Sequence, residues 1–383
     1  MISISESLKN QFQLDPKFIY LNHGSFGACP KPIFKERDKW QKEIEKQPVS
    51  FIEDRAIELL DWSREKLGSF INCNKDDLVY FPNPTTAMNM VIKSLDLGPG
   101  DEVLSSNHEY GAVEKTWDFV SRKKGFTYKK IDIPIPFNKE DFLDRIKNNI
   151  NNNTKIIFLS HITSPTAIIF PIEEICTLAK ELGIISIIDG AHSPAHIHLD
   201  IKALGADIYT GACHKWMLCP KGVSFLYSSK EMQKHLEPLV VSWGWESDNP
   251  SHSTFLDNNQ YQGTNDIGAY LTVPSSIKFL NKNNWHMVKK ECHEKLIESK
   301  NILLDTLNTN PICSDSSLGQ MASLQINVPD SIALYKYLKN HNIVVPVIDW
   351  NGLVFVRISY QCYNSMNDIE HLNHHLKKYL DSI

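Results

Sequence analysis

The feature that most constrains the fold is an alternation of short apolar runs with helix-like segments between residues 101 and 228. Runs such as TKIIFLSHI and IISIIDGA alternate with segments such as PIEEICTLAKELG, whose apolar residues have helical spacing. Strands that are apolar throughout are typical of a mostly parallel sheet covered by helices on both faces. Ligands bind such sheets at the carboxyl ends of the strands, so we expect functional residues there.

The sequence also predicts how the rest of the chain is organised. Residues 33–70 are rich in charge and are expected to form solvent-facing helices, and NPTTAMNMVIKSLD predicts an amphipathic helix with Asn83 or Thr85 as N-cap. Beyond about residue 277, longer charged helices and few strands indicate a smaller α+β unit. We therefore expect an N-terminal segment (1–20), a large α/β domain (21–275) and a small C-terminal α+β domain (276–383).

Composition excludes several classes of function. The chain has 383 residues, 42% hydrophobic and 22% charged, which is ordinary for a globular protein. Its net charge of -5 comes with interspersed signs and no basic stripe, which favours small-molecule chemistry over nucleic-acid binding. The N-terminus lacks a signal-peptide pattern, and no apolar run approaches the roughly 20 residues that span a bilayer. With eight cysteines and no CxxC pair, we expect reduced thiols, a cytoplasmic location and no membrane partner.

Lys215 stands in ADIYTGACHKWMLCPKG, directly after a strand-like run. A buried ammonium is costly unless it is paired or neutral, so this lysine is either on the surface or a reactive amine. Asp189 ends the run IISIID and is either a turn former or the partner of a buried cation.

Thr85 and Thr86 open an amphipathic helix, where free N–H groups favour either an ordinary cap or an anion. A lysine after a strand, a strand-end carboxylate and a helix start are together what pyridoxal phosphate requires. The amine forms an imine with its aldehyde, the carboxylate keeps its ring nitrogen protonated, and the helix start holds its phosphate.

Several stretches between residue 20 and about residue 364 carry a family resemblance: YLNHGSFGACP, NPTTAMN, NHEYGAV, LSHITSPTAIIFPI, IDGAHSPAH, YTGACHKWM, YQGTND and VRISYQCYN. In this order they resemble fold-type-I pyridoxal-phosphate enzymes of the class V aminotransferase superfamily. The resemblance is to the isopenicillin N epimerase-like branch and, more distantly, to cysteine desulfurases. It implies a large domain with a mostly parallel seven-stranded sheet, a small C-terminal domain, and a homodimer with the site at the subunit interface.

The resemblance also implies roles for individual residues. Lys215 would be the Schiff-base lysine, Asp189 the partner of the pyridine nitrogen, and His192 a contact of the phenolic oxygen. The implied phosphate ligands are Thr85, Thr86, His214 and, from a second subunit, Thr264.

Further positions concern the substrate side of the site. The resemblance places Tyr110 on the cofactor ring, and an alternative register gives that role to His108. It makes Arg357 the clamp of the substrate's α-carboxylate, a geometry suited to guanidinium, with Asn22 and His23 at the mouth of the site.

The chain departs from the desulfurase pattern in three places. Ala212 replaces a phosphate-binding serine, for which Thr210 is a possible substitute, and the desulfurase asparagine is replaced at Thr163 or Ser164. Desulfurases also carry a mobile-loop cysteine just before the arginine segment, but NHNIVVPVIDWNGLVFVR has none. A persulfide-relay desulfurase is therefore disfavoured.

These residues predict an enzyme in which Lys215 removes the α-proton of an amino acid. Reprotonation from the opposite face, with Tyr110 as candidate acid, gives an epimerase, and loss of a β-sulfur group gives a C–S lyase of the cysteine desulfhydrase type. An aminotransferase is the alternative, and an inert scaffold with this fold is a third.

A different class of enzyme is suggested by HSPAHIHLD, whose polar residues could bind zinc in a hydrolase. The candidate ligands are His192, His196, His198 and Asp200. Zinc motifs usually combine helical spacing with a distant third ligand, and Pro194 disfavours a helix here, so we consider this alternative the weaker one and expect no metal.

Overall fold

The computed structural model describes residues 6–383, and the largest sheet in this part of the chain has seven strands in the order β2-β8-β7-β6-β5-β3-β4. The strands are β2 (Leu78–Phe81), β3 (Glu102–Ser106), β4 (Thr127–Ile131), β5 (Thr154–Ser160), β6 (Ile185–Asp189), β7 (Ile208–Ala212) and β8 (Ser224–Ser228). All neighbouring pairs from β7 to β4 are parallel, whereas β8 is antiparallel to both of its neighbours. The expected α/β fold with a mostly parallel seven-stranded sheet is confirmed.

Both faces of this sheet are buried, which explains the continuous apolar runs. In β5, Ile156 and Phe158 belong to a core that includes residues of α4 (Pro84–Ser94) and α5 (Gly111–Lys124). The alternate residues, Ile157 and Leu159, belong to a second core that includes residues of α7 (Ile172–Glu181). Because successive side chains of a strand point to opposite faces, a strand between two helical layers is apolar at every position.

The charged region that precedes the sheet is helical but interrupted. It forms α1 (Lys31–Lys46), α2 (Pro48–Ser50), η2 (Phe51–Arg55) and α3 (Ala56–Ile71). Pro48 follows the end of α1 and cannot donate a helical hydrogen bond, which explains the break. The shorter or later elements of the large unit are η3 (Lys75–Asp77), α6 (Lys139–Asn149), α8 (Ile201–Leu204), α9 (Lys230–Gln233), α10 (Thr254–Gln260), η4 (Ile267–Thr272) and α11 (Val273–Lys282).

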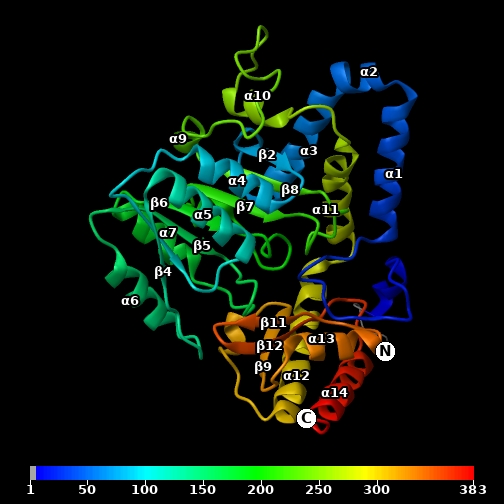
Figure 1. Cartoon of the computed structure of the whole chain (residues 1–383). Coiled ribbons are helices and arrows are strands. Elements are labelled where there is room, and N and C mark those ends of the chain that lie inside the picture. Colours follow the sequence, from blue (N-terminus) through cyan, green and yellow to red (C-terminus); the bar gives the residue numbers. More distant parts are fainter. Residues whose placement is uncertain (1–5) are drawn as a thin grey trace.

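The C-terminal part contains a separate antiparallel sheet of three strands in the order β11-β12-β9, as far as residues 6–383 show. Its elements are α12 (Trp285–Leu307), η5 (Asp315–Ser317), β9 (Met321–Ile326), α13 (Ser331–Asn340), β10 (Ile343–Val344), β11 (Val347–Trp350), β12 (Leu353–Ser359) and α14 (Met366–Leu380). Figure 1 shows α12 running from the large sheet's side of the molecule into this smaller unit.

The described N-terminal segment packs with the smaller unit. After η1 (Glu6–Gln11), β1 (Ile19–Tyr20) pairs in parallel with β10. The domain limits stay a prediction, and α11 packs against α3, which favours a boundary between α11 and α12 rather than at residue 275. Residues 1–5 lie outside the described part. No helix among residues 6–383 has the length and apolar character to cross a membrane.

Candidate active site

A cavity of about 610 Å³ opens where β5, β6 and β7 end, between the large sheet and β12 of the smaller unit. Residues from distant parts of the sequence line it: Ser25, Phe26, Asn83, Pro84, Thr85, Thr86, Tyr110, Ser160, Ile162, Ser164, Asp189, Ala191, His192, His214, Lys215 and Arg357. Of the twelve residues to which the sequence assigned a catalytic, cofactor or substrate role, eight are in this lining: Thr85, Thr86, Tyr110, Asp189, His192, His214, Lys215 and Arg357. The cavity has a volume typical of small-molecule sites.

Lys215 occupies the turn that follows β7. Its ammonium group forms no ion pair with any residue from 6 to 383. The Nζ atom lies 3.2 Å from Nε2 of His192. Burial lowers the pKa of Lys215 to about 7; the Asp189 carboxylate acts against this shift and the Arg357 charge reinforces it. At neutral pH a substantial fraction of this amine is therefore unprotonated, the form needed for a nucleophile or a base.

The backbone around Lys215 is tightly packed from the N-terminal segment. The ring of His23 lies with Nε2 3.2 Å from the Lys215 carbonyl oxygen. A side chain at Gly27 would collide with the same carbonyl, so this position has room only for glycine. The turn that presents the amine is thereby fixed by contacts outside the cavity.

Asp189 and His192 have unused hydrogen-bonding capacity beside the amine. Asp189 is 3% exposed, and its Oδ1 accepts the Ala191 N–H at 3.0 Å. Burial raises the pKa of Asp189, and Lys215 opposes that shift. The buried Nδ1 of His192 has no partner among the described residues, and burial, followed by the charge of Lys215, lowers its pKa well below the usual range. A polar aromatic ligand with a cationic ring nitrogen and a phenolic oxygen fits these groups.

The start of α4 forms an anion-binding end of the cavity. Asn83 is its N-cap, and Oδ1 of Asn83 accepts the Thr86 N–H at 2.8 Å and the Thr86 hydroxyl at 3.0 Å. Of the two cap candidates, Asn83 is confirmed, which leaves the Thr85 hydroxyl for another partner. No acidic residue stands in the first turn, so the positive end of the helix is not neutralised there.

Arg357 is buried on β12 and has no carboxylate partner within residues 6–383. Its Nη2 donates to the Ser25 hydroxyl at 2.6 Å, and its Nη1 donates to the backbone carbonyl and the hydroxyl of Ser164. Its Nε is buried without a partner, and burial lowers the pKa of Arg357 to about 10, still well above neutrality. A buried guanidinium without a counter-ion is costly, so an anionic ligand would stabilise it.

The two candidates for a ring contact lie in different environments. Tyr110 lines the cavity, precedes α5 and is 45% exposed. His108 is fully buried, and its two ring nitrogens lie 2.7 Å from the Thr166 hydroxyl and 2.9 Å from the Ile133 carbonyl. Because both nitrogens of His108 are used outside the cavity, the geometry favours the register with Tyr110.

The other four of these twelve residues do not line the cavity. The Thr210 hydroxyl donates to the Phe225 carbonyl at 2.8 Å inside the sheet, so Thr210 is not the predicted substitute for the missing serine. His23 is fully buried, and its Nδ1 lies 2.8 Å from the Tyr363 hydroxyl, so placing it at the mouth was wrong. Asn22 is likewise outside the lining, and Thr264 is exposed elsewhere on this chain.

The zinc hypothesis is contradicted by the geometry. Among residues 6–383 no group of three His, Cys, Asp or Glu side chains is placed to hold a metal ion. His192 faces Lys215, whereas His196 stacks on Trp216 with ring centroids 3.9 Å apart. Asp200 caps α8 through the Ala203 N–H. The irregular backbone after β6 turns the four candidate ligands toward different neighbours.

Sequence reasoning missed a buried carboxyl directly beside the cavity. Glu109 is 4% exposed and accepts hydrogen bonds from the hydroxyls of Ser106 and Ser160, each at 2.6 Å. Burial raises its pKa to about 8, against the effect of the two serines, and the nearby Asp189 adds to the increase. Glu109 joins Ser106 at the end of β3 to Ser160 at the end of β5, and it directly precedes Tyr110 in the loop between β3 and α5. In the sequence, Glu109 stands between His108 and Tyr110, and this local context does not distinguish a buried carboxyl from an exposed one.

The raised pKa of Glu109 predicts a pH-dependent effect of Glu109→Gln on stability. A carboxyl with a higher pKa in the folded state stabilises the fold below its unfolded pKa and loses that contribution as pH rises through the folded value. The contribution therefore declines between about pH 4.5 and 8. In urea titrations, the unfolding free energy of Glu109→Gln should increase relative to that of the wild type across this window, by on the order of 5 kcal/mol at most. A difference in unfolding free energy that does not change with pH would contradict the assignment.

Comparisons with known proteins agree with this geometry. The family model described as aminotransferase class-V matches residues 45–372. The chain is 29% identical to isopenicillin N epimerase of Amycolatopsis lactamdurans over 97% of each chain. It is 27% identical to the probable chloroplastic L-cysteine desulfhydrase of Arabidopsis thaliana, over 97% of this chain and 85% of that protein. Among solved structures, the cysteine desulfurase from Thermococcus onnurineus NA1 superposes with a TM-score of 0.84 at 20% identity, over the full length of both chains.

Proposed function

The chain belongs to the class V aminotransferase family of pyridoxal-phosphate-dependent enzymes, and on that basis we propose that it is a C–S lyase acting on an L-amino acid with a sulfur substituent on its β-carbon. Relatives named isopenicillin N epimerase and L-cysteine desulfhydrase support epimerase or lyase chemistry. Between these, the observation that carries the proposal is that Lys215, with a pKa of about 7, is the one lysine in the lining of the described cavity, which it shares with Arg357, a guanidinium that has no ion pair among residues 6–383. One such group is sufficient for β-elimination, whereas inversion needs a second on the opposite face.

The described cavity fits pyridoxal phosphate. When bound, the cofactor supplies an aldehyde for an amine and a ring that accepts the electron pair left by α-proton removal. We assign its phosphate to Thr85, Thr86, His214 and the start of α4, its ring nitrogen to Asp189, its phenolic oxygen to His192, and its ring face to Tyr110. Such a ligand would supply hydrogen-bond partners for the buried Nδ1 of His192 and for the hydroxyl of Thr85, which does not cap α4.

In this proposal the residues of the chain divide the work as follows. Arg357 binds the substrate's α-carboxylate in a bidentate pair, which positions the α-carbon near Lys215. Lys215 takes the α-proton as general base, and the C–S bond of the β-carbon breaks with release of a thiol. Water then converts the remaining product to pyruvate and ammonia. No cysteine lines the cavity among the described residues, so the chain offers no thiol there to accept sulfur.

A proton NMR time course in heavy water tests the reaction type. The holoenzyme is mixed with L-cysteine and S-substituted cysteines, without a keto acid. Appearance of pyruvate and thiol supports β-elimination. Loss of the α-proton signal from an otherwise intact amino acid, with no pyruvate, would contradict the lyase, and formation of the D-enantiomer in the same sample would make the enzyme an epimerase. Turnover only after a keto acid is added would make it an aminotransferase.

Epimerisation is the second candidate because Tyr110 lines the cavity and is free to reach a substrate. If Tyr110 delivers a proton to the opposite face, Tyr110→Phe abolishes inversion but leaves exchange of the α-proton by Lys215. Under the lyase proposal, Tyr110→Phe keeps the rate of pyruvate release within a few-fold of wild type. Chiral chromatography of the recovered amino acid, beside a pyruvate assay, separates these outcomes.

We further propose a homodimer and a cytoplasmic location. Thr264 is exposed on its own chain, and a phosphate contact from Thr264 of the partner subunit would explain why this motif does not reach the cavity of the same chain. All eight cysteines, each within the described residues, are free, which suits a reducing compartment. Light scattering of the purified holoenzyme tests the dimer.

A further inference from the structure

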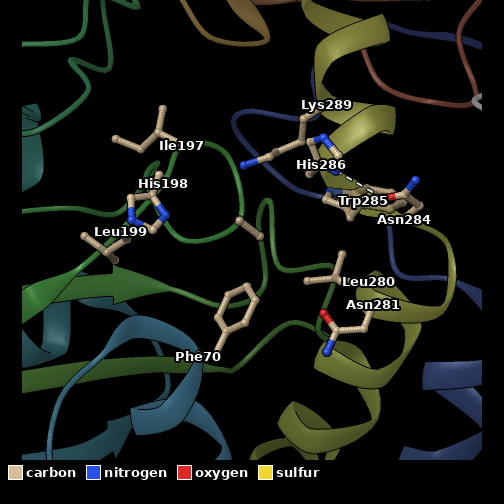
Figure 2. A pocket seen from close by; sticks show the side chains of 11 residues that line it. Phe70, Ile197, His198, Leu199, Leu280, Asn281, Asn284, Trp285, His286 and Lys289 are labelled. Atoms are coloured by element: carbon tan, nitrogen blue, oxygen red, sulfur yellow. Dashed lines mark hydrogen bonds between the residues drawn. The ribbon is translucent and has the colours of Figure 1, made fainter.

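A second cavity, separate from the candidate active site, lies where α11 meets α12. Its volume is about 370 Å³, and its lining comes from α3, the segment 195–199, the end of α11 and the start of α12. Figure 2 shows Lys289 extending from α12 across this cavity toward the segment that carries Ile197 and His198. The volume is within the range of small-molecule sites and is sufficient for a ligand of amino-acid size.

Lys289 supplies the charge in the lining of this second cavity, whose other polar side chains are Trp285, His198, His286, Asn281 and Asn284. No aspartate or glutamate lines it. Lys289 is half-buried and has no ion pair or hydrogen bond to any residue from 6 to 383, and burial lowers its pKa. Trp285 is 6% exposed, and its indole N–H is buried without an acceptor. An ammonium without an ion pair, beside a cavity that no carboxylate lines, favours an anion.

The ends of two helices meet at this cavity, the carbonyl end of α11 and the N–H end of α12. α12 is a long helix of 23 residues that starts at Trp285, and no side chain caps its first turn and no acidic residue stands in it. Its N-cap, Asn284, has a left-handed backbone conformation, and the side chain of Asn284 pairs instead with His286 at 3.1 Å. The start of α12 favours an anion and the carbonyl end of α11 opposes it, so Lys289 supplies the net positive charge at this place.

The remainder of the lining is apolar, which limits the kind of anion. Leu199 and Leu280 are buried, and Phe70 and Ile197 are half-buried around the cavity. A phosphate or sulfate ion would leave these side chains without contacts. A monocarboxylate with a compact aromatic or branched body satisfies both the cationic and the apolar parts.

We propose that this cavity is a binding site for a small apolar monocarboxylate, distinct from the site that contains Lys215. Its position connects it to both domains. The segment 195–199 follows His192 closely, and His196 in that segment stacks on Trp216 beside Lys215. The other wall is the start of α12, the helix that leads into the smaller unit, and Arg357 lies on β12 of that unit. A ligand here would thus bind between the two parts of the chain that form the active site.

The test is a 19F NMR titration of 4-fluorobenzoate with the holoenzyme. Because Arg357 also attracts carboxylates, the titration uses Arg357→Met as the background. We expect Lys289→Met in this background to weaken binding at least tenfold, and Lys289→Gln to act alike. Lys290→Met is the matched control, since Lys290 is the next residue on α12 but is exposed and pairs with Glu294. The neutral 4-fluorobenzamide should bind at least tenfold more weakly than the carboxylate.

Equal binding of 4-fluorobenzoate with and without Lys289, or an equal effect of Lys290→Met, would overturn the proposal. If Arg357→Met does not fold, the same variants are compared in the wild-type background, where loss of Lys289 should remove one of two binding phases. Persistence of both phases would then count against the site. Because the experiment measures binding rather than turnover, its result tests the carboxylate site independently of the lyase assignment.

Discussion

Replacement of Lys215 by alanine should remove both the yellow absorbance of lysine-bound cofactor and catalytic turnover. The Lys215 amine lines the cavity, has a pKa of about 7 and has no ion pair among the described residues. We assign two roles to it, the covalent bond to the cofactor and the removal of the α-proton. Loss of general base catalysis alone costs about 10²- to 10⁴-fold in rate. Absorbance spectra and pyruvate release from L-cysteine measure the two effects.

Lys215→Arg is the matched variant for this prediction, because it keeps the positive charge but supplies neither an imine nor a base near neutral pH. It should lose the absorbance and turnover as the alanine variant does. Binding of the cofactor's phosphate should persist in both variants, since Thr85, Thr86 and the start of α4 are unchanged. Turnover by Lys215→Arg near the wild-type rate would show that another residue moves the proton.

Replacement of Arg357 by methionine should raise KM for the amino acid and lower kcat/KM. Hydrogen bonds to charged groups contribute about 1.5–3 kcal/mol each, so the loss of a bidentate pair of them should cost about 3–6 kcal/mol, or roughly 10²- to 10⁴-fold in kcat/KM. The spectrum of the bound cofactor should not change, because Arg357 is not among its assigned ligands. Steady-state kinetics with L-cysteine provide the measurement.

The contacts of Arg357 supply a control for this second prediction. Ser25→Ala removes the hydroxyl that accepts from Nη2 but leaves the charge, so it should reduce kcat/KM far less than Arg357→Met. Substrate analogues without the α-carboxylate should bind both proteins equally. If Arg357→Met prefers the substrate with an α-carboxylate over the analogue without it as strongly as the wild type does, the guanidinium has a structural role only.

The sequence was informative where one local pattern determines the result. Continuous apolar runs such as IISIID predicted β6 and the residue that ends it, because a strand between two helical layers has no polar face. Strand-end positions then brought Asp189 and Lys215 to the same edge of the sheet. The amphipathic spacing of NPTTAMNMVIKSLD predicted α4, and Asn83, one of its two N-cap candidates, is the cap.

Contacts between distant segments could not be inferred from local patterns. His23 stands beside a glycine turn in the sequence, but its pairing with Tyr363 and with the Lys215 carbonyl buries it behind the cavity. Thr210 precedes Lys215 closely, yet the register of β7 with β8 gives its hydroxyl to Phe225. Buried Glu109 accepts hydrogen bonds from Ser106 at the end of β3 and Ser160 at the end of β5. The sequence around either serine does not indicate this contact.

The central claim, that Lys215 is the residue to which the cofactor is bound, is tested most directly by reduction and peptide mapping. The holoenzyme is treated with borohydride, which fixes the bond between lysine and pyridoxal phosphate, and is then digested and analysed by mass spectrometry. We expect the pyridoxyl group on the peptide that contains Lys215. A pyridoxyl group on another lysine, such as the neighbouring Lys221, with Lys215 unmodified, would contradict the account.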